Sequence, residues 1–263
     1  MSGVVADLRA DLAAEWERFI AKCTLEGIPV FHSKQIQESL TGKVEIEHLS
    51  ENQFGSLLPN LIYLKIKQSI DWLLAIILFP IFILMILFIG PIILLESGGP
   101  IFFVQRRVGY RGQVFKVYKF RTMRHECGED SDREGEDRDR AMTRDGDHRI
   151  TRIGNFLRRY RIDEFPQIIN ILRGEMSWIG PRPEAQPLAE WYEAELPFYC
   201  YRHVVRPGIS GWAQVNQGHV AVPGEVLHKL HYDFFYIKYL SPWLDLLVAL
   251  KTVRTVLLGI GAK

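Results

Sequence analysis

The stretch WLLAIILFPIFILMILFIGPIILL, residues 72–95, carries no charge and decides the class of this protein. A helix that crosses the hydrocarbon core of a bilayer needs about 20 apolar residues, so this stretch is long enough to enter a membrane. It starts too far from the N-terminus, and is too long, to be the apolar part of a signal peptide. A buried core helix and a single straight membrane span are the two simpler interpretations.

We predict a third arrangement, a re-entrant helical hairpin that enters and leaves the membrane by the same face. Pro80 leaves only residues 72–79 before it, too few to cross a bilayer, and proline inside a helix removes a backbone hydrogen bond. Gly90-Pro91 is a second irregularity. Cationic residues flank the run on both sides: Lys65, Lys67, Arg106, Arg107 and Arg111. Both flanks obey the positive-inside rule only if the chain turns back.

The composition is that of a globular protein with balanced charge. The 263 residues are 48% hydrophobic and 24% charged, which excludes a disordered chain and suffices for one large domain or two modest ones. With 32 basic and 31 acidic residues the net charge is +1, so we expect no nucleic-acid partner. Cys23, Cys127 and Cys200 are odd in number and far apart, which disfavours a disulfide scaffold or zinc site and favours a reducing compartment.

Local patterns predict mostly helix. Apolar residues recur at three- and four-residue steps over 5–20, which is typical of an amphipathic helix. The other expected elements are strands at 27–31, 101–105 and 114–120, a turn at 109–112, and helices up to Leu40 and over 60–71, 150–160, 164–173, 184–200, 224–238 and 243–258. The last helix is apolar enough to rest on a membrane surface. Residues 124–149 are almost all charged or small, which indicates a solvated loop or a lid.

Asp163 and Glu164 are the most informative pair of residues. Asp163 stands where a helix N-cap is expected and Pro166 falls in the first turn, so we expect the carboxylate to meet unpaired N–H groups that favour its ionised form. Adjacent carboxylates can also hold Mg²⁺ through their oxygens. The simpler interpretation is a capping aspartate with an exposed neighbour.

Arginines lie on both sides of this pair in the sequence. Arg158, Arg159 and Arg161 precede it, and Arg182 follows between two prolines. A planar guanidinium matches phosphate oxygens, and bracketing prolines leave an arginine little backbone freedom. Carboxylates, a metal and arginines beside a membrane hairpin together indicate phosphoryl transfer on a lipid phosphate. A basic helix face bound to anionic lipid is the alternative.

Several stretches, in this order, carry a family resemblance. They are SGGPIFF (97–103), QRRVG (105–109), FKVYKFRTM (115–123), ITRIG (150–154), IDEFPQ (162–167), GPRP (180–183), RPGISGWAQV (206–215) and WLDL (243–246). Over about residues 60–260 the chain resembles the bacterial sugar transferase family, monotopic phosphoglycosyl transferases that start glycoconjugate assembly on polyprenyl phosphate. A PRP or DE stretch alone would be weak evidence for this family, but the occurrence of all these stretches in this order is specific.

The resemblance implies a two-step reaction. The Asp163 carboxylate would attack the β-phosphate of a UDP-sugar, releasing UMP and keeping the phosphosugar, which polyprenyl (undecaprenyl) phosphate then accepts. Asp163 would be the nucleophile and Glu164 a metal ligand or base, with Mg²⁺ required and either carboxylate in contact with it. Glucose, galactose and N-acetylated aminosugars are all compatible donors.

The resemblance also assigns further positions. Lys119, Arg158 and Arg182 match residues that bind phosphate or nucleotide, and Asp233 and Asp245 match acidic positions whose role, structural or catalytic, stays open. A hydrolase that uses the same dyad with water, and a scaffold without catalysis, are the competing functions.

We therefore expect an α+β, mostly helical fold. Its parts are an N-terminal accessory region (1–60), a remnant of a nucleotide-fold domain; a re-entrant membrane hairpin (61–96); and a compact cytosolic catalytic domain (97–263) with a small β-hairpin and surface-lying amphipathic helices. The resemblance places the protein in the bacterial inner membrane, with its catalytic domain facing the cytoplasm and membrane lipids as partners. A homodimer is compatible with it.

Two stretches depart from the family pattern. Phe79-Pro80 stands where the family often has Ser-Pro, and Gln217-Gly218-His219 follows where it usually continues Gly-Arg. The first departure predicts a shallower or differently satisfied helix break. The second removes an expected arginine, so either His219 takes its place or the sugar or nucleotide preference differs.

Overall fold

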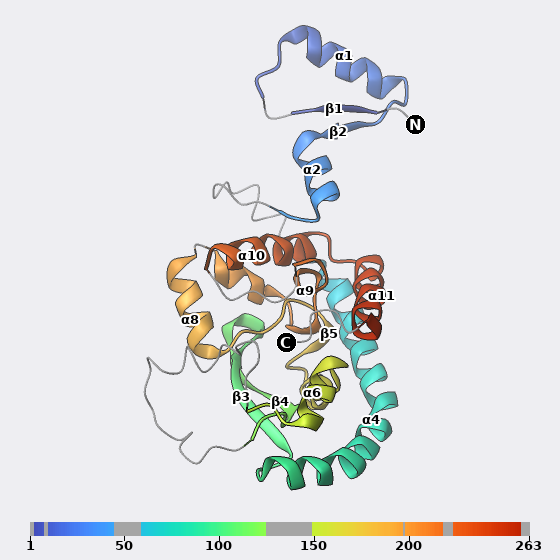
Figure 1. Cartoon of the computed structure of the whole chain (residues 1–263). Coiled ribbons are helices and arrows are strands. Elements are labelled where there is room, and N and C mark those ends of the chain that lie inside the picture. Colours follow the sequence, from blue (N-terminus) through green and yellow to red (C-terminus); the bar gives the residue numbers. More distant parts are fainter. Residues whose placement is uncertain are drawn as a thin grey trace. The chain divides into compact units, whose positions relative to one another are not determined.

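The computed structural model describes residues 3–7, 10–44, 59–124, 149–196, 198–217 and 223–258 (Figure 1). The predictions for the charged segment and for Gly218-His219 fall outside these residues. The two ends of the charged segment are described, and Arg124 N donates a 2.9 Å hydrogen bond to Arg149 O. The chain divides into two compact units, Met1–Glu47 and His48–Lys263.

The first unit alternates strand and helix. Its elements are β1 (Val4–Ala6), α1 (Ala14–Leu25), β2 (Val30–His32) and α2 (Ser33–Thr41), and β1 pairs with β2 in parallel. The predicted helix over 5–20 is wrong at its start, because residues 4–6 pair with β2 and the helix begins only at Ala14. The predicted strand near 27–31 and the helix up to Leu40 are confirmed, and Gly42, with φ 67°, ends that helix.

Helix α4 (Leu61–Ser97) contains the whole apolar stretch. Asn60 caps its start, since its Oδ1 accepts hydrogen bonds from the N–H groups of Ile62 and Tyr63, and Gly98 ends it with φ 66°. Pro80 and Pro91 lie inside the helix, which curves in Figure 1 but is not interrupted. Only 17% of its most apolar window is buried, which argues against a core helix and indicates membrane association.

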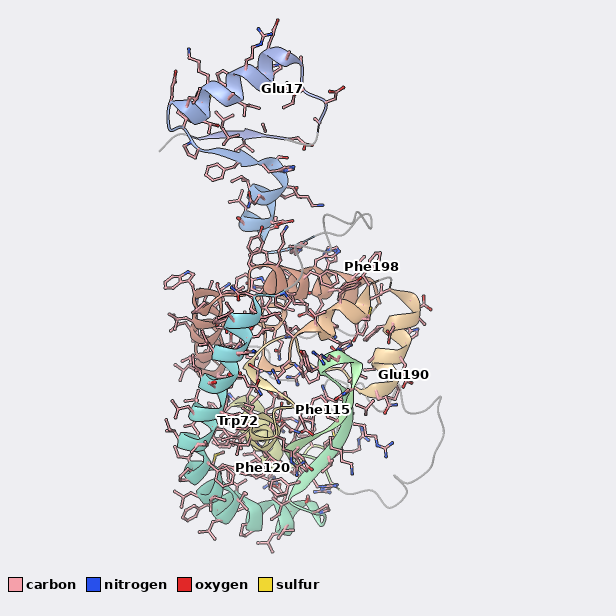
Figure 2. All side chains as sticks on the ribbon, turned by 180° about the vertical axis from the view of Figure 1, so that it is seen from behind. Glu17, Trp72, Phe115, Phe120, Glu190 and Phe198 are labelled. Atoms are coloured by element: carbon pink, nitrogen blue, oxygen red, sulfur yellow. The ribbon has the colours of Figure 1, made fainter. Side chains whose placement is uncertain are left out.

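One face of α4 packs on the rest of the second unit through an aromatic cluster. Phe82 is 2% exposed, and its ring centroid lies 6.3–6.5 Å from those of Phe102, Phe120 and Phe165. Figure 2 shows Phe120 in the interior beside the helix, and Phe115 of the same strand belongs to the same hydrophobic core. The β-hairpin and the 3₁₀ turn η2 (Ile162–Gln167), which contains the Asp163-Glu164 dyad, are thereby fixed against α4.

Polar contacts anchor both ends of this packing. The indole Nε1 of Trp72 donates to Ile171 O at 3.1 Å near the start of the apolar stretch. At the far end, the Glu96 carboxylate accepts from the backbone N–H groups of Arg152 and Ile153 at 2.7 and 3.0 Å. These N–H groups lie at a helix start and have no intrahelical partner, so Glu96 satisfies them.

The second unit confirms a mostly helical α+β class. The predicted hairpin is β3 (Phe102–Val108) antiparallel to β4 (Val114–Phe120), with η1 (Tyr110–Gly112) at its turn. The elements that follow are α6 (Arg152–Arg159), η2 (Ile162–Gln167), α7 (Ile168–Leu172), β5 (Ser177–Ile179), α8 (Gln186–Glu195), η3 (Tyr199–Val204), β6 (Gly208–Ser210), α9 (Trp212–Gln217), α10 (Pro223–Lys238) and α11 (Pro242–Leu258). Strands β5 and β6 pair in parallel.

Asp245 on α11 joins three helices. Its carboxylate accepts hydrogen bonds from Lys67 Nζ at 2.7 Å and Tyr63 OH at 2.6 Å, both on α4, and from Tyr236 OH on α10 at 2.7 Å. Its role in the structure is therefore to hold these helices together. Large apolar side chains of α11 stay exposed: Trp243, Leu246, Leu250, Val253 and Leu257.

Candidate active site

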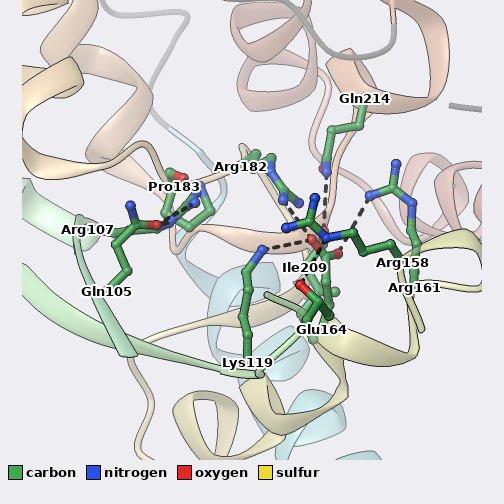
Figure 3. A network of polar contacts seen from close by, with 11 residues as sticks. Gln105, Arg107, Lys119, Arg158, Arg161, Glu164, Arg182, Pro183, Ile209 and Gln214 are labelled. Carbon is green, nitrogen blue, oxygen red and sulfur yellow. Dashed lines mark hydrogen bonds and ion pairs between the residues drawn. The ribbon is translucent and has the colours of Figure 1, made fainter. Parts of the chain in front are cut away.

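All five predicted site residues come together: Figure 3 shows Lys119, Arg158, Glu164 and Arg182 side by side, and Asp163 interacts electrostatically with all four. Lys119 comes from β4, Arg158 from α6, Asp163 and Glu164 from η2, and Arg182 from the segment between β5 and α8. Strand β4 and helix α6 both pack on η2, so the cationic side chains are placed around the dyad by the same packing that forms the core.

Glu164 is enclosed by cations. It is 4% exposed, and its Oε1 lies 2.6 Å from Arg182 Nη2 and 3.2 Å from Lys119 Nζ. Its Oε2 lies 3.6 Å from Arg161 Nη1. Burial alone would raise the pKa of Glu164, but the Arg182 and Lys119 charges hold that pKa well below its usual range. Glu164 is therefore a permanently ionised carboxylate at neutral pH.

Asp163 is placed differently from its neighbour. It is half-buried, and no described residue donates a hydrogen bond to its carboxylate. Burial raises the pKa of Asp163 to about 6, with a further contribution from the Glu164 charge, while Lys119, Arg158 and Arg182 act in the opposite direction. The Asp163 carboxylate is thus available to a ligand and titrates close to neutral pH.

The prediction that Asp163 caps a helix is wrong. It lies inside the 3₁₀ turn η2, which starts at Ile162 after Arg161 with φ 52°, and α7 begins only at Ile168. The cause lies in the tertiary structure. Glu164 contacts cations from other elements, and the 3₁₀ turn η2 that carries Glu164 also contains Asp163. The cations around the dyad, rather than a helix N-terminus, supply the positive potential.

Two of the cations have further constraints. Burial lowers the pKa of Lys119 to about 8, against the effect of the Glu164 charge, which raises it. Lys119 therefore loses its charge far more readily than an exposed lysine. Arg158 Nε donates to Thr122 Oγ1 at 2.9 Å, which orients the Arg158 guanidinium next to the dyad.

The two carboxylates fit a magnesium ion. Glu164 Oε2 is a buried oxygen without a hydrogen-bond donor, and the Asp163 carboxylate is open. Mg²⁺ is commonly bound through one or two carboxylates plus substrate phosphates and water. Among the described residues there is no cluster of three His, Cys, Asp or Glu side chains, so a metal site made entirely of protein ligands is not indicated there.

The sequence analysis missed a second polar layer behind the dyad. Arg107, expected only as a membrane-flanking charge, donates to Gln105 and to the Pro183 carbonyl. Arg202 lies 2.8 Å from Asp233, which gives that aspartate a structural partner. Arg107 could have been found from its place in the QRRVG stretch, whereas Arg202 carries no local signal.

Comparison with known proteins gives a matching family model and several similar relatives. The family model described as bacterial sugar transferase matches residues 62–259. UDP-N-acetylgalactosamine-undecaprenyl-phosphate N-acetylgalactosaminephosphotransferase of Aeromonas hydrophila is 52% identical over 99% of this chain, which spans 60% of that relative's length. The UDP-glucose:undecaprenyl-phosphate glucose-1-phosphate transferases of Caulobacter vibrioides and Escherichia coli K12 are each 38% identical, over 77% and 65% of this chain and 74% and 37% of their own lengths.

Proposed function

The chain belongs to the bacterial sugar transferase family, and from this premise we propose that it transfers a hexose-1-phosphate from a UDP-sugar to undecaprenyl phosphate with release of UMP. The names of the relatives support the substrates. The observation that carries the proposal is the contrast within the dyad: Glu164 is held by cations, while Asp163 beside it is left without a hydrogen-bond donor among the described residues.

In the proposed first step an Asp163 oxygen forms a bond to the β-phosphorus of the donor. The bond from that phosphorus to the bridging oxygen breaks, and UMP leaves with the electron pair. In the second step a phosphate oxygen of undecaprenyl phosphate attacks the same phosphorus, the bond to Asp163 breaks, and the carboxylate is restored. Splitting the transfer in this way lets one site serve a water-soluble donor and a membrane-bound acceptor in turn.

Cations make attack by an anion on an anionic diphosphate feasible. Lys119, Arg158 and Arg182 lie around the dyad and would bind the phosphate oxygens as charge develops. Mg²⁺ held by Asp163 and Glu164 would neutralise further phosphate charge. Because Arg182 and Lys119 also pair with Glu164, their side chains are already oriented before the donor binds.

We further propose that α4 is a re-entrant membrane helix in the bacterial inner membrane, with residues 97–263 on the cytoplasmic side as the catalytic domain. The curvature of α4, its exposed apolar face and the cationic flanks support this topology. The exposed apolar side chains of α11 would contact the same membrane surface. Residues 1–60 would be an accessory region. A homodimer is also compatible with the family, and measuring the mass of the purified protein in nanodiscs tests it.

The proposed sugar follows from the relative that is 52% identical to this chain. That protein's name gives N-acetylgalactosamine, so UDP-N-acetylgalactosamine is the first donor to test, with UDP-glucose second.

The test uses purified protein in nanodiscs with Mg²⁺, UDP-sugar and undecaprenyl phosphate, and it measures UMP. We expect turnover only with the lipid, and a single turnover of UMP without it, accompanied by the mass of one phosphosugar on the protein. Asp163→Asn should lose at least about 10³-fold in rate, whereas Glu190→Gln, an exposed acid on α8, should not. Sustained UMP release without lipid would indicate a hydrolase, and full activity of Asp163→Asn would remove the nucleophile.

A further inference from the structure

Residues 181–184 form an extended segment in which every carbonyl accepts a hydrogen bond. Two donors are backbone N–H groups: Gly208 donates to Pro181 O at 3.0 Å, and Val108 donates to Glu184 O at 3.1 Å. The other two are arginine side chains, since Arg202 Nη2 donates to Arg182 O at 2.8 Å and Arg107 Nη1 donates to Pro183 O. Two of the four residues are prolines without an N–H, so external donors hold much of this segment.

Both arginines are themselves fixed. Nε and Nη2 of Arg107 share the Gln105 Oε1 acceptor at 3.2 and 2.9 Å, and the two side chains lie two residues apart on one face of β3. Arg202 is 3% exposed and pairs with Asp233 at 2.8 Å and with Tyr199 OH at 2.8 Å. The planar guanidinium, with several donors in a fixed arrangement, allows each arginine to be anchored and to hold a carbonyl at once.

We propose that Arg107 is a positioning residue for Arg182. Within the described chain Arg107 hydrogen bonds to Gln105 and Pro183 and to neither carboxylate of the dyad. What it holds is the carbonyl next to Arg182, whose Nη2 lies 2.6 Å from Glu164 Oε1. A long side chain such as that of Arg182 loses much rotamer entropy when it is fixed. A rigid backbone at residues 182–183 lowers the entropy that Arg182 must lose to reach Glu164. Arg107 thus acts on the dyad through the backbone of residues 182–183.

A double-mutant cycle tests this inference, which rests on the proposed function for its activity readout. We expect Arg107→Ala to lower kcat/KM for the UDP-sugar by about 10- to 100-fold, because small misplacements of an oriented group cost rates of this order. In an Arg182→Ala background the same change should cost less than about threefold, because the group that it positions is gone. Losses that multiply would show that Arg107 acts independently of Arg182 and would overturn the proposal.

Hydrogen exchange provides a second readout that needs no activity. In Arg107→Ala, the amides of Val108 and Gly208, which donate to Glu184 O and Pro181 O of this segment, should exchange faster. Peptides of α10 should exchange as in the wild type, which also reports that the protein is folded. Arg106→Ala is the matched control, because Arg106 is exposed on the opposite face of β3. Unchanged exchange of the Val108 and Gly208 amides in Arg107→Ala would overturn the proposal, and a wild type that releases no UMP would reject only the proposed function.

Gln105→Leu is the second variant if Arg107→Ala does not fold. It leaves the arginine in place but removes the acceptor that orients it, so we expect faster exchange of the same two amides and a smaller loss of kcat/KM. That loss should again disappear in the Arg182→Ala background. A Gln105→Leu protein with wild-type exchange and activity would contradict the proposed role of the fixed guanidinium.

Discussion

The first half-reaction should have a bell-shaped pH dependence set by Asp163 and Lys119. Attack on the donor needs the ionised Asp163 carboxylate, so activity falls as pH drops through its pKa of about 6. Binding of the diphosphate needs the protonated Lys119 ammonium, so activity falls as pH rises through its pKa of about 8. The two limbs therefore have opposite signs and belong to residues from different elements.

The size of each limb follows from these pKa values. With a pKa of about 6 the ionised fraction of Asp163 falls from about 0.9 at pH 7 to about 0.1 at pH 5, so kcat/KM should fall about ninefold. An ordinary aspartate, with a pKa near ~3.9, would stay more than about 90% ionised at pH 5. At pH 9 only about a tenth of Lys119 should remain protonated, and kcat/KM should again fall several-fold.

The assay is the initial rate of UMP release at low UDP-sugar concentration and constant ionic strength, with Mg²⁺ kept too low to occupy the free enzyme, so that kcat/KM reports Asp163 without a bound metal. For a two-step reaction with an enzyme-bound intermediate, kcat/KM for the donor reports only the first half-reaction. This choice matters because the lipid phosphate is a monoester with its own pKa near about 6, whereas the diphosphate of the donor has no group of that kind.

The variant Lys119→Arg separates the limbs. Arginine stays protonated throughout this range, so the alkaline limb should disappear while the acid limb stays near pH 6. A wild-type rate that is flat down to pH 5 would refute the account of Asp163. An alkaline limb that persists unchanged in Lys119→Arg would refute the account of Lys119.

Three further outcomes are expected. Glu164→Gln should shift the acid limb to lower pH, because the Glu164 charge raises the pKa of its neighbour; a shift upward in the pH profile would contradict this coupling. Phe82→Ala should lower the free energy of unfolding by about 3–5 kcal/mol. Phe88→Ala should lower it by about 0.5 kcal/mol or less, because the Phe88 side chain is 69% exposed on the same helix. Equal thermal midpoints of the two variants would reject the aromatic anchor. Asp245→Asn should cost about 3–5 kcal/mol by leaving Lys67 buried without its counter-ion, and adding Lys67→Met should recover part of the midpoint; no recovery would contradict the pairing.

Local sequence signals located most elements and the residues of the candidate site. The uncharged run at 72–95 identified the membrane-associated helix, because length and hydropathy alone decide whether a helix can enter a bilayer. The turn at 109–112 between two alternating stretches located the β-hairpin. The DE and PRP stretches identified residues that the structure places together around one site.

Errors arose where a long-range contact overrides a local pattern. Residues 4–6 satisfy a helical periodicity, yet they pair with β2, some 26 positions away in the register. Asp163 has the sequence context of an N-cap but lies inside a 3₁₀ turn whose position is set by contacts of Glu164. Pro80 is a different case: we predict a kink or break there, and the helix runs through it without interruption and curves.

Hydropathy, periodicity and turn chemistry act over a few neighbouring residues, and these local signals suffice to predict a membrane-associated helix, a β-hairpin and an Asp-Glu pair with several arginines. Which carboxylate is enclosed by cations, and which is left open to a ligand, follows from the packing of the folded chain. Lys119 and Glu164 are 45 positions apart and meet at 3.2 Å. The strength of such an ion pair depends on separations of a few ångströms and on burial, and both are properties of the packed chain.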